Sequence, residues 1–208
     1  MKSLKLGIIA LFSLVLVVSS CKKDDEKPDD NSSGVKSGEV SLSRETDYGN
    51  DWIYFSFEEG KEVDAGDHEH TLNWDIAFNR YNVRTNCGES GSGQAGAYDA
   101  GQIAFSALTE AAEDGYTVDD TIQIVEEFIG FNVTWMTSTG NDIFKGCIIR
   151  EMTSSGPRFT PNDHVYVVKT AKGKYAKIWI KDYYNAEGES GYITFKYHYQ
   201  SGEGRKLE

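Results

Sequence analysis

The stretch YITFKYHYQ, residues 192–200, decides the fold class. Its apolar and aromatic residues alternate with polar ones: Ile193, Phe195, Tyr197 and Tyr199 fall on one side, and Thr194, Lys196, His198 and Gln200 on the other. Because successive side chains of a β-strand point to opposite faces, the stretch predicts a strand with one buried face.

The same alternation continues upstream and predicts a C-terminal meander. HVYVVKT (164–170) and KYAKIWIKDYY (174–184) flank a short turn, AKG, whose glycine tolerates a positive φ. The loop NAEGESG joins the second of these strands to the third. Together the three segments indicate antiparallel pairing.

Further strands are predicted at WIYFSF (52–57) and LNWDIAF (72–78), and TIQIVEEFI (121–129) could be strand or helix. FSALTEAAED (105–114) favours a helix, with Ser106 as its N-cap. The predicted fold class is therefore all-β, mostly antiparallel with one short helix, in one domain over residues 38–208.

The N-terminus has the layout of a secretory signal over residues 1–20, with Lys2 and Lys5 before an apolar run. Its end, VSSC, resembles the lipobox of bacterial lipoproteins, which makes Cys21 the predicted lipidated residue. Residues 21–37 are charged and predict a flexible acidic tether. The Lys-then-acid start of this tether resembles the signal that exports Bacteroidetes lipoproteins to the outer face of the outer membrane.

The formal net charge of the 208 residues is −12, and loss of the signal's two lysines makes the chain more acidic. Since a phosphate backbone demands a basic face, no nucleic-acid partner is expected. Cys87 and Cys147 remain after lipidation, either as a disulfide or as two separately buried thiols.

No catalytic motif holds up, so no enzymatic activity is predicted. GSGQAG (91–96) has dinucleotide-loop spacing but lacks a helix start after it, and GESGS (88–92) lacks the last glycine of a serine elbow. DAGDHEH (64–70) gathers two histidines with acids, which suits a metal, although simple exposure is the favoured interpretation.

Residues 134–152, TWMTSTGNDIFKGCIIREM, hold both methionines other than Met1. Methionine commonly fills gaps in a core, but its thioether also binds Cu(I) and haem iron. A hairpin about Gly140–Gly146 would place Met136 opposite about Arg150, with Met152 as a diagonal neighbour. If the strands splay instead, a flat macrocycle could sit between them.

LNWDIAFNRYNVRTNCGESGSGQAGAYD (72–99) resembles the HmuY family of haem-binding lipoproteins of Bacteroidetes, and residues 165–200 look like the closing meander of that family. The resemblance implies a hand-shaped β fold that grips haem (iron protoporphyrin IX). It also implies a lipid-anchored, surface-exposed outer-membrane protein without other membrane contact. Haem-carrying host proteins and a TonB-dependent receptor, to which haem is relayed, are the implied partners.

The ligands implied by the resemblance are Met136 and Met152, because no histidine lies between His70 and His164. Two thioethers favour the reduced state of haem. Cys147 and His164 are alternative ligands. The remaining candidates are wall residues and propionate partners: Trp135, Phe131 and Phe144, then Arg150, Lys145 and Arg158. A binding module of the same fold for another porphyrin, a glycan or a protein is the alternative function.

Overall fold

The computed structural model describes residues 34–44, 51–129 and 132–208. The predicted signal peptide (1–20), Cys21 and the tether as far as residue 33 lie outside these ranges. The first strand, β1 (Val35–Ser41), begins three residues before the predicted domain boundary at 38.

A five-stranded antiparallel sheet contains the predicted meander. Its strands run in the order β1, β13 (Ser190–Gln200), β12 (Tyr175–Tyr184), β11 (Val165–Lys169) and β6 (Gly96–Asp99). The predicted alternation on β13 is confirmed, since the face with Phe195 and Tyr197 is buried while Lys196 between them is partly exposed. Gln200 departs from the pattern and is buried.

A four-stranded sheet packs against the buried face of the first. Its order is β3 (Lys61–Val63), β2 (Ile53–Ser56), β4 (Ile76–Asn79) and β5 (Asn82–Thr85). Phe55 on β2 meets Phe195 and Tyr197 on β13 edge-to-face, with ring centroids 5.2 and 5.6 Å apart. Aromatic packing between the sheets therefore forms the main core.

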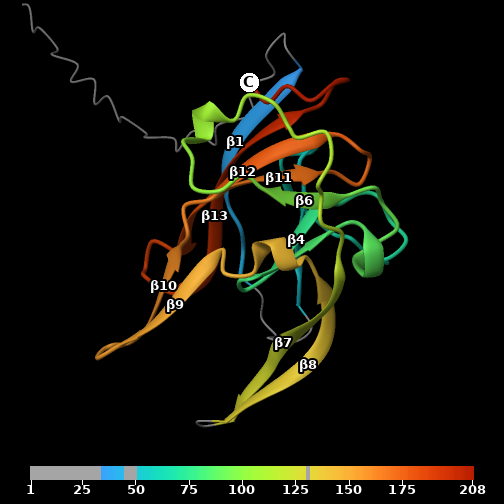
Figure 1. Ribbon diagram of the computed structural model, residues 1–208. Helices are drawn as coiled ribbons and strands as arrows, with labels where there is room; N and C mark the ends of the chain where they lie inside the picture. Colours follow the sequence, from blue (N-terminus) through green and yellow to red (C-terminus); the bar gives the residue numbers. More distant parts are fainter. Residues whose placement is uncertain (1–33, 45–50, 130–131) are drawn as a thin grey trace, which may run out of the picture.

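Two hairpins project from one end of this two-sheet body (Figure 1). The first finger consists of β7 (Asp120–Ile129) and β8 (Asn132–Gly140), and the second finger of β9 (Ile148–Thr153) and β10 (Gly156–Pro161). The ambiguous segment 121–129 is thus a strand. A 3-10 helix, η3 (Asp142–Phe144), connects the two fingers.

Of the two arrangements considered for the methionine strands, the hairpin that pairs them is wrong, and the two strands are unpaired with each other. β8 pairs with β7, which sets Met136 opposite Ile124, and β9 pairs with β10, which sets Met152 opposite Pro157. The segment from Asn141 to Cys147 cannot act as a simple turn, because its Phe144 is buried in the core. Each strand instead pairs across the shorter connection to its other neighbour.

The expected helix over 105–114 is also wrong, because only the 3-10 helix η2 (Phe105–Ala107) forms there. The buried Lys177 donates two hydrogen bonds, at 2.9 and 2.7 Å, to the carbonyls of Phe105 and Leu108. Tertiary contacts thus take the backbone groups that a helix needs, which overrides local propensity. η1 (Gly88–Ser90) is likewise a 3-10 helix.

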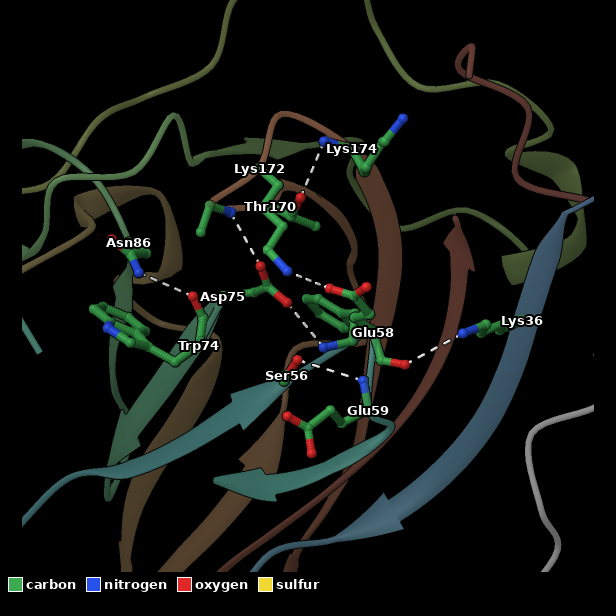
Figure 2. A network of polar contacts seen from close by, with 12 residues as sticks. Lys36, Ser56, Glu58, Glu59, Trp74, Asp75, Asn86, Thr170, Lys172 and Lys174 are labelled. Atoms are coloured by element: carbon green, nitrogen blue, oxygen red, sulfur yellow. Dashed lines mark hydrogen bonds and ion pairs between the residues drawn. The ribbon is translucent and has the colours of Figure 1, made fainter. Parts of the chain in front are cut away.

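Asp75, directly before β4, joins the two sheets (Figure 2). Its buried carboxylate accepts hydrogen bonds from the backbone N–H of Phe57 at 2.9 Å and of Ala171 at 3.0 Å. Lys172, the next residue, pairs with Glu58 above this contact. The β11–β12 turn is thereby fixed to the four-stranded sheet.

None of the described segments is a helix with the length and apolarity that a membrane crossing requires.

Candidate functional site

A pocket of about 460 Å³ opens where the two fingers leave the body. Its apolar wall comes from both fingers, from the β4–β5 turn and from η3, and its polar wall mainly from β7 and η3. The lining includes Tyr81, Gln123, Val125, Trp135, Asn141, Asp142, Phe144, Lys145 and Ile148. An apolar ligand with a polar edge fits such a lining.

The second finger carries Met152, which is 67% exposed. On β9 it shares a face with Arg150 and Ile148, because side chains two residues apart point the same way. Ile148 lines the pocket. Met152 therefore extends the pocket's side of the second finger outward.

The first finger places Met136 and Trp135 on opposite faces. Trp135 is paired with Val125 and lines the pocket together with it, whereas Met136 is paired with the fully buried Ile124. Trp135 is 58% exposed and Met136 is half-buried. Trp135 is thus the residue of β8 that belongs to the pocket, as its predicted role as a wall residue requires.

Of the three predicted propionate partners, Lys145 follows η3, whereas Arg150 and Arg158 lie on opposite faces of the second finger. Lys145 lines the pocket, and Arg150 shares the face of Ile148 and Met152. Arg158 is paired with Glu151 on the opposite face. Only Lys145 and Arg150 are thus placed to meet an anion over the pocket.

Among the other candidates, Phe144 lines the pocket from the core and packs on Tyr166, whereas Phe131 lies outside the described residues. Cys147 is a free, buried thiol, and burial raises its pKa to about 12. The thiol therefore stays protonated near neutral pH and does not provide the thiolate that iron would bind. His164 binds the Asp99 carboxylate at 2.9 Å, which supports a structural role.

Cys87 is likewise free and buried, so the disulfide alternative is wrong. It lies in a polar cluster at the root of the first finger. Asp119, directly before β7, accepts hydrogen bonds from Thr85 N–H and from Asn141, directly after β8, both at 2.8 Å. Both ends of the first finger are therefore fixed to β5.

The 64–70 segment does not form a metal site. His70 binds Asp67 at 3.0 Å on the surface, whereas His68 turns inward against Tyr54 and Trp74. Throughout the described ranges, no three His, Cys, Asp or Glu side chains gather closely enough for a metal ion. The turn is exposed as expected except at Ala65, which is buried, and at His68, which is half-buried.

The 91–96 glycine run packs around Asn86 rather than forming a loop for phosphates. Gly93 N–H donates to the Asn86 side-chain oxygen at 3.0 Å, and a Cβ on Gly91 would lie 2.3 Å from the same oxygen. Glycine is required here by close approach within the protein.

Sequence reasoning missed a cluster around Arg84, on the side of β8 away from Trp135. Its guanidinium lies 3.9 Å above the Trp52 ring and donates to Ser138 Oγ and the Thr139 carbonyl, each at 3.0 Å. Desolvation lowers the pKa of Arg84. Arg84 lies within the 72–99 segment that carries the family resemblance, but no local pattern reveals that an arginine is buried.

Comparisons with known proteins agree with this architecture. A protein from Bacteroides vulgatus ATCC 8482, named as HmuY-like and heme-binding, is 27% identical over 82% of this chain and 94% of its own, with a TM-score of 0.61. The apo HmuY analogue of Tannerella forsythia is 21% identical over 80% and 96%, with a TM-score of 0.64.

A protein from Bacteroides fragilis NCTC 9343, named as a lipoprotein, is 21% identical over 85% of this chain and 95% of its own, with a TM-score of 0.61. Among curated protein sequences, none is significantly similar to this chain. The HmuY protein family model matches residues 48–197, which cover the four-stranded sheet, both fingers and the five-stranded sheet except for β1 and the end of β13. This chain belongs to the HmuY family.

Proposed function

We propose that this chain binds haem between its two fingers, with Met136 and Met152 as iron ligands. The observation that carries the proposal is where large apolar side chains are exposed. Three of the seven in the described residues lie on the finger faces that carry Trp135 and Met152, namely Val133, Trp135 and Met152. Burial of such surface against a porphyrin face supplies binding energy. Family membership and the heme-binding name of the Bacteroides vulgatus relative support the same function.

Met152 is the better placed of the two ligands. Met136 faces away from the pocket, so its coordination requires the outer part of the first finger to twist about its axis. The register shift between Val125 and Glu127 lies one pair beyond the Met136–Ile124 pair, next to Val125–Trp135, and interrupts the strand ladder there. Such bulges allow local twist and bending.

The test is a titration of the chain lacking residues 1–21 with haem, reduced and oxidised, followed by absorbance. We expect saturable one-to-one binding, tighter for reduced haem. Met152→Ala is expected to weaken reduced-haem binding by roughly tenfold or more, since even an outer-shell partner of a metal ligand contributes that much.

Matched variants separate ligand loss from general damage. Ile149→Ala, on the other face of β9, and Cys147→Ser should each bind reduced haem as the parent does. Equal affinity of the parent and Met152→Ala would remove Met152 as a ligand. If iron-free protoporphyrin binds as tightly as haem, the site recognises a porphyrin without iron ligation.

We further infer that Cys21 anchors the protein to the outer membrane, where it takes haem from host haem proteins and relays it to a TonB-dependent receptor without catalysing a reaction. The N-terminal sequence and the lipoprotein relative of Bacteroides fragilis support the anchor. Cys21→Ser should move the protein from the membrane fraction to the soluble fraction. An unchanged distribution on cell fractionation would contradict lipid anchoring.

A further inference from the structure

Arg84 is a buried cation whose hydrogen-bond partners are all neutral. The residue is 8% exposed. Nε and Nη2 are well bonded at 3.0 Å to the Thr139 carbonyl and Ser138 Oγ. These two contacts hold the guanidinium against the base of β8 and fix where Nη1 points.

Nη1 has only long contacts. It lies 3.3 Å from Tyr54 Oη and 3.5 Å from His68 Nε2, beyond the usual range of about 2.7–3.2 Å for an N–H···O hydrogen bond. Within the described ranges, no carboxylate forms an ion pair with Arg84. A buried charge is normally paired, so this side of the guanidinium suits an anionic oxygen.

The neighbours of Nη1 supply a further donor, the Tyr54 hydroxyl, and a route to the surface. Tyr54 Oη accepts from Arg84, which leaves the hydroxyl hydrogen free for another acceptor. Tyr54, His68 and Trp52 are each half-buried, so the cluster reaches solvent. Trp52, stacked on the guanidinium, offers an apolar surface beside the charge.

We propose that Arg84, Tyr54 and His68 form a carboxylate-binding site for the ligand of this protein. Under the proposed function, on which this assignment rests, the carboxylate is a haem propionate. Ser138, which is bonded to Arg84, lies two residues from Met136 on the same face of β8. The site and Met136 therefore lie on the same side of the first finger, away from Trp135. Lys145 and Arg150 lie on the pocket side.

The decisive experiment compares reduced haem with its dimethyl ester, which lacks the propionate charges. Affinities are measured for the parent chain, Tyr54→Phe and Tyr81→Phe. Tyr54→Phe keeps the ring that packs on Trp74, and Tyr81→Phe is the control because Tyr81 lines the pocket on the other side. Since a hydrogen bond to a charged group is worth about a factor of ten or more, we expect Tyr54→Phe to weaken haem binding roughly tenfold.

The ester must be unaffected by Tyr54→Phe for the site to stand, and Tyr81→Phe must not change the haem-to-ester ratio. An equal loss for haem and ester in Tyr54→Phe overturns the carboxylate site while leaving haem binding intact. If the parent binds neither compound, the proposed function fails. The carboxylate site is then tested by itself, in an NMR titration with sodium propionate. Saturable NMR shifts at Trp52 and Arg84, absent with sodium chloride at equal ionic strength and lost in Tyr54→Phe, support it, whereas no shift overturns it.

Discussion

The residues that make this chain recognisable as a sequence are anchors in the fold. Trp74 donates to the His68 carbonyl at 3.0 Å, and Asn86 donates to the carbonyls of Thr71 and Trp74, each at 2.9 Å. Thr85 binds the buried Asp119. Buried polar groups of this kind tolerate little change, because an unsatisfied partner is costly. The 72–99 segment that carries the family resemblance therefore belongs to the two-sheet body, while the candidate haem ligands lie on the fingers.

Asp75, which lies in the segment LNWDIAF (72–78), predicts a pH dependence of stability. Desolvation raises its pKa to about 6, against the lowering effect of the N–H groups of Phe57 and Ala171. The folded state thus holds the proton more tightly than the unfolded state does. The stabilisation is fully present below the ordinary pKa of 3.8 and is lost as the pH rises through about 6.

The measurement is urea unfolding of the parent and Asp75→Asn between about pH 4 and pH 7. We expect the parent to lose on the order of 2 kcal/mol relative to Asp75→Asn across this window. Asp75→Asn is expected to be less stable at every pH because its amide N–H₂ opposes one backbone N–H. Parallel pH curves for the two proteins would show that Asp75 does not titrate in this range.

Strand β13 of the five-stranded sheet and strand β8 of the first finger differ in how far the local sequence predicts them. Strand β13 was predictable because alternation reports one buried face directly. The partner of β8 was not, because the choice depends on whether residues 141–147 stay outside the body, and the burial of Phe144 and Cys147 decides that. The register of Trp135 and Met136 on β8 follows from pairing with β7. The sequence alone therefore could not predict which of the two side chains faces the pocket.

Gly140 predicts how strongly the root of the first finger resists change. A Cβ at this position would lie 2.5 Å from Ile122 Cδ1 and 2.9 Å from the Val83 carbonyl oxygen. The isoleucine methyl can shift, but the backbone carbonyl of β5 cannot do so cheaply. Gly140→Ala is therefore expected to reduce the free energy of unfolding by about 1–3 kcal/mol, as overpacked sites do.

Gly140→Ala should also weaken haem binding, because the displaced root moves Trp135. Thr137→Ala is the control, since Thr137 lies on the exposed part of the same strand and should change stability by less than about 0.5 kcal/mol. Chemical denaturation and a haem titration of both variants check the prediction. Stability equal to the parent's in Gly140→Ala would mean that the root accommodates a methyl group.

For the whole molecule, the two sheets share one aromatic core and should unfold together. Phe55 on β2 is fully buried against Phe57, Phe195 and Tyr197, so it belongs to both sheets at once. Phe55→Ala is expected to cost about 3–5 kcal/mol. Far-UV circular dichroism and tryptophan fluorescence should report one coincident transition in both proteins. Separate transitions would mean that the sheets are independent units.

Fixation of the first finger at one end only has a mechanical consequence. Asp119 and Asn141 hold its root to β5, whereas Glu126, Glu127, Asn132, Val133 and Trp135, further out, are exposed. A beam clamped at one end bends least at the clamp and most at its free end. We therefore expect the gap between the fingers to widen from the mouth inward, so that a haem bound as proposed would leave with its outer edge first while the two-sheet body keeps its shape.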